Sequence, residues 1–208
     1  MTEAAIPSTR TSPVATADVT AKAGLVLLLL LALLFPDMSH LRDKAAGLRA
    51  IGYPAASFLI PALWWAFWKD RMSFPWLPDL LVTLTCFTDI LGNRMNLYDT
   101  VESFDDWMHF MNCAFLAAAV IMLTLPRTTT LPRTIERGLA FGATAAIAWE
   151  IAEYYAFIAN STERRFAYAD TLSDLALGVL GAIVGACVVH HLWQQGRLQD
   201  TVPVPQSA

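Results

Sequence analysis

The chain has 208 residues, of which 56% are hydrophobic and only 15% are charged. Soluble globular domains contain about 45–50% apolar and about 25% charged residues, so this composition argues against a soluble enzyme and against a disordered chain. The formal net charge of −4 provides no basic surface for phosphate groups, which argues against nucleic acid as a partner. The composition predicts a multi-pass membrane protein whose partners are membrane lipids.

A long apolar region lies between two polar ends of the chain. Residues 1–20 are rich in Thr, Ala, Ser and Pro, and residues 194–208 are polar with two prolines, so we expect both ends to be disordered tails. The membrane domain is then predicted to cover residues 21–193. Lys22 stands at its start, and we expect its ammonium group to extend to the membrane interface.

Six apolar stretches follow one another along the membrane domain, at residues 24–35, 48–68, 76–92, 107–125, 138–159 and 171–193. A helix needs about 20 residues to cross the hydrocarbon core, and most of the stretches approach that length. The predicted fold is therefore all-α, a polytopic membrane bundle of six transmembrane helices. Gly178, Gly181 and Gly185 share one face of the last helix and predict close packing there.

The distribution of basic residues indicates the orientation. Six spans place both termini on one side of the membrane. Of the 14 Lys and Arg residues, eight then fall on the side of the termini and six on the other side. Because Lys and Arg are in excess in cytoplasmic loops, this small bias predicts cytoplasmic termini.

Three pairs of ionisable residues lie at the start of the fourth stretch, deep in the fifth and at the start of the sixth. In chain order they are Asp105 with His109, Glu150 with Glu153, and Asp170 with Asp174. Spacings of three or four residues place both members of each pair on one helix face. Ionisable groups within a membrane span are costly and usually serve a function, so these six residues are the candidate site.

The topology brings the three pairs to the same half of the bilayer. The fourth and sixth stretches begin on one side of the membrane, and the fifth stretch ends there. Glu150 is about 18 Å along the fifth helix and so lies beyond the midplane. Asp89, near the end of the third stretch, approaches the same side. We therefore expect one cluster in this half and no comparable set in the other half.

Three interpretations of the cluster stay open. A bound divalent ion would relieve the repulsion among the carboxylates, and an oxygen-rich set with one imidazole favours Mg²⁺, Mn²⁺, Fe²⁺ or Zn²⁺. A proton relay and a structural hydrogen-bond network are the alternatives. The Glu-x-x-His motif of ferritin-type diiron bundles is absent from the sequence. The predicted metal ligands are Asp105, His109, Glu150, Glu153, Asp170 and Asp174.

The metal interpretation predicts a metal-dependent hydrolase or transferase acting on a lipid or lipid-linked substrate. A divalent ion activates bound water and polarises a phosphoryl or carbonyl oxygen. Glu153, deep in its span, is the candidate general base, and Asp105 is the second candidate catalytic residue. The rivals are a proton- or cation-coupled transporter, against which the absence of a visible inverted repeat argues, and a non-catalytic scaffold or resistance factor.

The order of the three pairs resembles the YjdF-like family of bacterial inner-membrane proteins, which has no established activity. The family pattern is Asp-Lys-x-x-His, then Glu-x-x-Glu, then Asp-Thr-x-Ser-Asp, and here Asp106 replaces the Lys. A looser similarity extends to VanZ-like proteins, which share the first motif and an acidic motif before the final span. The resemblance covers residues 85–190 and implies a six-span fold in the bacterial cytoplasmic (inner) membrane with a shared polar site, without implying a reaction.

Overall fold

The computed structural model describes residues 12–35, 38, 46–156, 158–160 and 167–198. Helices account for most of these residues, and no strand occurs among them, so the predicted all-α class is confirmed. In chain order the helices are α1 (Pro13–Leu34), α2 (Ala46–Ser57), α3 (Leu59–Leu63), the π-helix η2 (Trp64–Trp68), α4 (Trp76–Arg94), α5 (Leu97–Thr100), α6 (Phe104–Thr124), α7 (Leu131–Ala156), the 3₁₀-helix η3 (Ile158–Asn160) and α8 (Ala167–Gln194).

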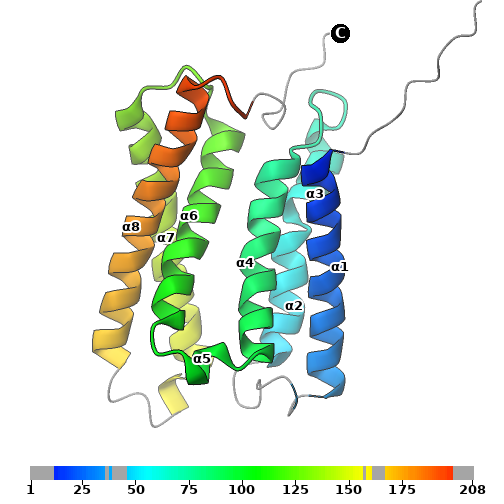
Figure 1. Ribbon diagram of the computed structural model, residues 1–208, viewed down its shortest axis with the longest axis vertical. Coiled ribbons are helices and arrows are strands. Elements are labelled where there is room, and N and C mark those ends of the chain that lie inside the picture. Colours follow the sequence, from blue (N-terminus) through cyan, green and yellow to red (C-terminus); the bar gives the residue numbers. More distant parts are fainter. Residues whose placement is uncertain (1–11, 36–37, 39–45, 157, 161–166, 199–208) are drawn as a thin grey trace, which may run out of the picture.

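The long helices run side by side in two groups (Figure 1). Helices α1, α2 and α4 pack on one another, as do α6, α7 and α8, and the packing of α4 on α6 joins the two groups. The beginnings of α6 and α8 and the end of α7 lie at the same end of the bundle (Figure 1). This arrangement agrees with the topology from which the convergence of the three residue pairs is predicted.

Fewer than six of the described helices are long and apolar enough to cross a membrane on their own. Helices α1, α6 and α8 are each long and apolar enough to cross a membrane, and residues 47–57 and 59–68 qualify together as one span bent by 44°. Pro61 has no N–H to donate to the carbonyl of Ser57, which accounts for the break between α2 and α3. Each of the six apolar stretches is helical over most of its described residues, but the count of six spans is not confirmed.

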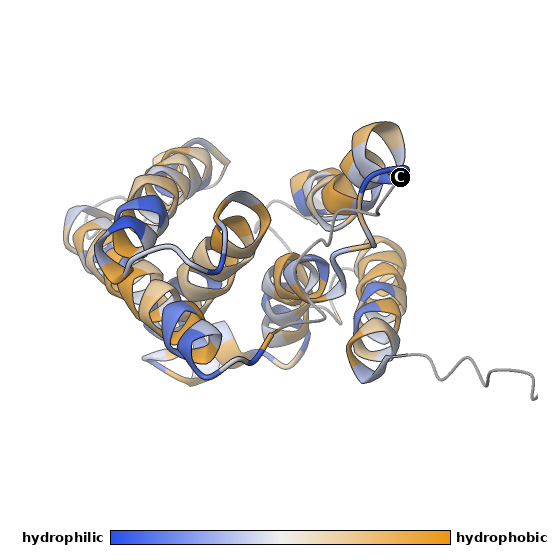
Figure 2. Cartoon of the chain, turned by 90° about the horizontal axis from the view of Figure 1, so that it is seen from above, coloured by the Kyte–Doolittle hydropathy of each residue, from blue (hydrophilic) through white to orange (hydrophobic). Residues whose placement is uncertain are grey.

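Apolar side chains form the interior and also cover the outside of the bundle. One core cluster, including Leu25 and Ile90, lies between α1, α2 and α4, and another, including Ile121 and Val189, lies between α6 and α8. Large apolar residues of α1 and α8 are exposed, and Figure 2 shows hydrophobic residues on outward as well as inward faces. Helices that are apolar all round are typical of membrane spans.

The glycines of α8 allow α6 to approach closely. A Cβ atom added at Gly185 would lie 2.5 Å from the carbonyl oxygen of Ala114, and one at Gly181 would collide with the carbonyl oxygen of Phe110. The predicted small-residue face of the last helix is therefore confirmed. Because the backbones of α6 and α8 meet, the candidate site residues at their beginnings come together.

The first helix begins earlier than predicted. It starts at Pro13, so the expectation of a disordered tail over residues 1–20 is wrong for residues 13–20. Lys22 is buried rather than extended to the interface, because its ammonium group pairs with Asp18 and Asp79. Residues 1–11 and 199–208 lie outside the described residues. The expectation of disorder there stays a prediction.

Candidate metal site

His109 is the centre of the candidate site, on the second turn of α6. Its Nε2 atom lies 3.6 Å from Oδ1 of Asp105 on the same helix and 3.8 Å from Oδ1 of Asp174 on α8. Its Nδ1 atom lies 3.6 Å from Oε1 of Glu150 on α7. The structure thus brings together residues from three helices around one imidazole ring, as predicted for these four residues.

Two groups of three potential metal ligands share this imidazole. Asp105, His109 and Asp174 form one group, and His109, Glu150 and Glu153 form the other, with the ligand atoms of each group within 4.8 Å of one another. Ligand atoms bound to a tetrahedral ion at ~2.0–2.1 Å lie about 3.3 Å apart. The distances of 3.6–3.8 Å from His109 to Asp105, Glu150 and Asp174 are slightly longer than this, so a small inward movement of the side chains would bring them within reach of a shared ion.

Burial makes the charge of this cluster costly. Glu150 is 7% exposed, and its Oε1 atom makes no hydrogen bond to a described residue. His109 and Asp174 are also buried, whereas the side chain of Asp105 is 42% exposed. A buried carboxylate oxygen without a partner costs free energy, which a cation or a proton beside it would offset. The cluster is therefore open at Asp105 and enclosed at Glu150.

Asp170, the sixth predicted ligand, lies outside both groups. It is exposed, one turn before Asp174 on α8. Asp106, which replaces the Lys of the YjdF-like pattern, is not one of the potential ligands either. Its Oδ1 atom accepts a hydrogen bond of 3.1 Å from the hydroxyl of Ser173. This contact links the beginning of α6 to the beginning of α8.

Asp89, expected to approach the site, has partners of its own. The hydroxyl of Tyr53 and Nε of Arg49 donate to its Oδ2 atom over 2.5 and 3.2 Å, and the hydroxyl of Tyr98 donates to Oδ1 over 2.7 Å. Burial of the phenol and the charge of Asp89 raise the pKa of Tyr98. Sequence reasoning missed these partners. The spacing of four residues between Arg49 and Tyr53, which places both on one face of α2, was the available signal.

A second buried charge cluster lies between α1 and α4, at the other end of the bundle. Nζ of Lys22 donates to Asp18 over 2.7 Å, to Asp79 over 2.8 Å and to the hydroxyl of Thr83 over 2.6 Å. The expectation that this half lacks a comparable set of polar residues is therefore wrong. Asp18 and Lys22 are four residues apart, a spacing from which their pairing could have been predicted. The pairing was missed because Asp18 was expected to belong to a disordered tail.

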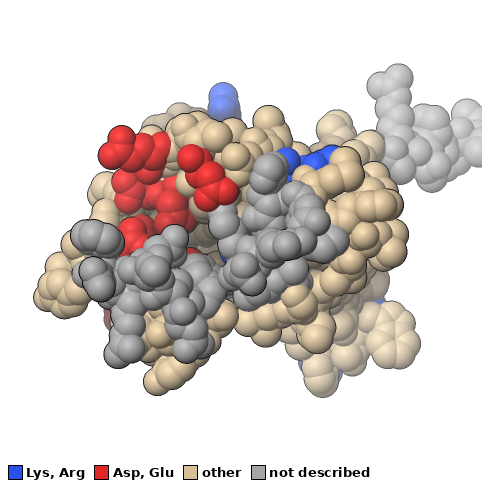
Figure 3. Space-filling model, turned by 90° about the horizontal axis from the view of Figure 1, so that it is seen from below, with Lys and Arg blue, Asp and Glu red and all other residues tan. Residues whose placement is uncertain are grey.

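The surface at the beginnings of α6 and α8 is acidic. Figure 3 shows Asp and Glu side chains gathered over one half of the molecule at this end. Among the described residues, the acidic side chains near this end that are exposed or partly exposed are Asp99, Glu102, Asp105, Asp106, Glu153 and Asp170. This surface surrounds the open side of the His109 cluster, so a cation approaching the cluster would be attracted to it.

The apolar helices and their buried ionisable residues define a helical membrane protein with a carboxylate–histidine cluster. More particularly, the chain belongs to the family described as predicted membrane protein (DUF2238), whose model matches residues 21–195. YjdF is a member of this family, so the resemblance is confirmed at the family level, and the similarity to VanZ-like proteins stays a prediction. No curated protein and no solved structure matches the chain.

Proposed function

We propose that this protein is a metal-dependent membrane enzyme that hydrolyses, or transfers a group from, a lipid or lipid-linked substrate. The observation that carries the proposal is the position of Glu150. Its Oε1 atom is buried without a hydrogen-bond partner among the described residues and lies 3.6 Å from His109. A divalent cation bound by His109 would find two carboxylates in either group of potential ligands, Asp105 with Asp174 or Glu150 with Glu153.

The two sides of the imidazole suggest different roles for the carboxylates. An ion on one side of the ring would be bound by Nε2 of His109 and by one carboxylate oxygen each from Asp105 and Asp174. Glu150, beside Nδ1, would hold the ring in its orientation, as carboxylates commonly do for metal-bound histidines. Glu153 then remains as the candidate general base. The alternative is an ion on the Nδ1 side, with Glu150 and Glu153 as ligands.

A bound divalent ion would activate water and polarise a phosphoryl or carbonyl oxygen of the substrate. Asp105 is at the open side of the cluster, where its half-exposed carboxylate would meet an incoming substrate. Trp107, Tyr155 and Tyr168, on the three helices of the site, have large exposed aromatic rings. Such rings are enriched at the headgroup level of membranes, which supports an amphiphilic substrate that arrives through the bilayer.

The test is elemental analysis of the protein purified in a mild detergent. We expect about one divalent ion per chain in the wild type and its loss in the His109→Ala and Glu150→Ala variants. Glu136→Gln is the matched control and should retain the metal, because it removes an exposed carboxylate near the beginning of α7, about 20 Å from Glu150 along the helix axis. Lipid turnover in nanodiscs should then follow metal content. A wild-type protein that binds no divalent ion, with variants that leave its cellular phenotype unchanged, would overturn the proposal.

A proton- or cation-coupled transporter is the second candidate. The observation that favours it is the buried cluster of Asp18, Lys22 and Asp79, since a transport path needs polar residues in both halves of the membrane. Cation or proton flux into sealed liposomes, abolished by the Glu150→Ala and Asp79→Asn variants, would support this function. Lipid turnover without flux would support the enzyme.

The proposal includes a location in the bacterial cytoplasmic membrane with cytoplasmic termini. The resemblance to bacterial inner-membrane proteins and the division of the basic residues support it. In this orientation the His109 cluster lies in the outer half of the bilayer.

A further inference from the structure

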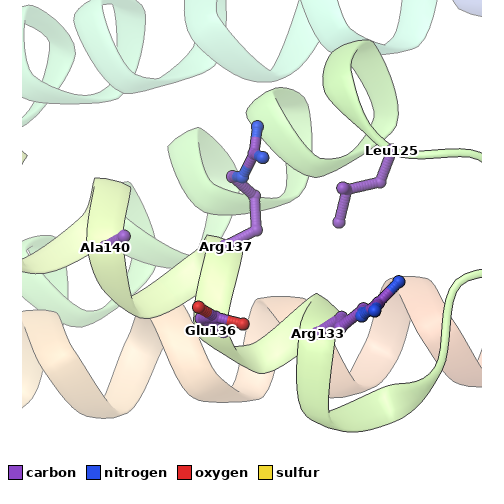
Figure 4. A pocket seen from close by; sticks show the side chains of 5 residues that line it. All are labelled: Leu125, Arg133, Glu136, Arg137 and Ala140. Carbon is purple, nitrogen blue, oxygen red and sulfur yellow. The ribbon is translucent and has the colours of Figure 1, made fainter.

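A cavity of about 460 Å³, open to the surface, lies where α6 ends and α7 begins (Figure 4). This is the end of the bundle opposite to the beginning of α6, where His109 lies (Figure 1). The walls of the cavity are Leu125, which follows the end of α6, and four residues from the first turns of α7, namely Arg133, Glu136, Arg137 and Ala140. The volume is within the range of small-molecule sites, roughly 300–1,000 Å³. Arg137 precedes Glu150 by about 20 Å along the axis of α7, so this cavity is separate from the candidate metal site.

Two arginines give the cavity its chemical character. Arg133 and Arg137 are four residues apart and so lie on one face of α7. Among the described residues, neither guanidinium group makes an ion pair or a side-chain hydrogen bond, although Glu136 is adjacent in sequence. Figure 4 shows both guanidinium groups extending away from the Glu136 carboxylate. Two planar donor groups therefore remain available to an anion.

Apart from the two arginines and Glu136, the walls of the cavity are apolar. Leu125 and Ala140 line it beside the arginines, so a bound molecule would meet both charge and hydrocarbon. A guanidinium group pairs with phosphate through two parallel hydrogen bonds, and basic pockets between transmembrane helices bind anionic lipid headgroups. A free phosphate ion would use the arginines but would gain nothing from the apolar walls.

We propose that this cavity binds an anionic phospholipid, with Arg133 and Arg137 on the headgroup phosphate and Leu125 beside the start of an acyl chain. The site is distinct from the proposed catalytic cluster and does not depend on it. Bound lipid would connect the end of α6 to the beginning of α7 and so stabilise the connection between them. Glu136 limits the affinity, because its carboxylate adds a negative charge to the rim.

The test measures binding of phosphatidylglycerol to the full-length protein in detergent by native mass spectrometry, with phosphatidylcholine and inorganic phosphate as comparison probes. We expect Arg133→Gln/Arg137→Gln to weaken phosphatidylglycerol binding at least ~10-fold, since two charge-assisted contacts are lost. Lys69→Gln/Arg71→Gln is the matched control. It removes the same charge from the same end of the bundle but outside the cavity, and should change binding less than about twofold.

A further variant keeps the test independent of any folding defect. Glu136→Gln should strengthen phosphatidylglycerol binding by about two- to fivefold, because it removes a like charge beside the phosphate. Unchanged binding in the double arginine variant, or equal weakening in the lysine–arginine control, would overturn the proposal. So would inorganic phosphate that displaces the lipid at millimolar concentration, which would identify a soluble-anion site. Equal affinity for phosphatidylcholine would likewise count against it.

Discussion

The ammonium nitrogen of Lys22 in α1 lies 2.8 Å from a carboxylate oxygen of Asp79 in α4, a residue 57 positions away in the chain. The same nitrogen donates to Asp18 and Thr83, so all three of its hydrogen atoms have acceptors. Both carboxylates are almost fully buried. This ion pair therefore connects the apolar helices α1 and α4, and each buried charge is stabilised by the opposite charge beside it.

Replacing Lys22 should destabilise the bundle strongly. Lys22→Met leaves Asp18 and Asp79 buried without a cation, and removal of one member of a buried ion pair costs about 3–5 kcal/mol. The free energy of unfolding in mixed micelles measures this loss. Lys69→Met, on an exposed lysine, should cost less than about 1 kcal/mol. If Lys22→Met is as stable as the wild type, the ion pair makes no net contribution.

Two aspartates of α8 should differ in their effect on metal binding. Asp174→Asn removes a buried carboxylate 3.8 Å from His109, and we expect about 10- to 100-fold weaker metal affinity. Asp170→Asn removes an exposed carboxylate one turn away, outside the ligand groups, and should change affinity only a few-fold through long-range charge. Isothermal titration calorimetry with Zn²⁺ and Mn²⁺ separates the two. An equal loss of metal affinity in both variants would indicate that Asp170 is also a metal ligand.

Tyr98 should make stability depend on alkaline pH. Burial and the neighbouring charge of Asp89 raise its pKa above the usual value of 10. Below pH 10 the phenol keeps its proton in both the folded and the unfolded chain, so its stabilising effect is complete. Above pH 10 the unfolded chain loses the proton first, and stability falls by up to ~1.4 kcal/mol per pH unit.

Thermal unfolding of the Tyr98→Phe variant between pH 8 and pH 11 checks this dependence. The variant should be about 1–3 kcal/mol less stable at pH 8, because it loses a hydrogen bond to a carboxylate, and its stability should fall less steeply above pH 10. Tyr168→Phe, at an exposed tyrosine, should keep the wild-type slope. Identical slopes for Tyr98→Phe and the wild type would contradict the assignment.

Two glycines should respond in opposite directions to the same substitution. A Cβ atom at Gly181 meets the backbone of α6 at Phe110, so Gly181→Ala must separate α6 from α8, at a cost of about 1–3 kcal/mol or more. A Cβ atom at Gly52 meets nothing within 4 Å, so Gly52→Ala should be neutral or stabilising by up to about 1 kcal/mol. Unfolding in mixed micelles gives both values. Tolerance of Gly181→Ala would show that the two helices pack less closely.

The six-span topology predicts that reporter fusions at residues 130 and 165 lie on opposite sides of the membrane, because one span separates them. Fusions at residue 130 and at the C-terminus should report the cytoplasmic side. A fusion at residue 165 should report the outer side, in agreement with the division of the basic residues. If both internal fusions report the same side of the membrane, α7 does not cross the membrane and the six-span count is wrong.

The sequence alone determined the helical class and the identity of most residues around His109. Apolar stretches of about 20 residues favour helices, and spacings of three or four place His109 with Asp105, and Glu150 with Glu153, on shared faces. These are properties of a single helix. The order of the helices then placed both pairs toward one end, and the structure brings them together there.

Only the tertiary structure decided which faces meet. Asp170 and Asp174 share a helix face in the sequence, yet only Asp174 contacts His109, because the close packing of α8 on α6 at Gly181 and Gly185 sets the depth and rotation of α8. Lys22 was expected at the membrane interface and instead pairs with Asp79. The spacing of residues along one helix contains no information on its rotation against a neighbour, which depends on side-chain packing between distant segments.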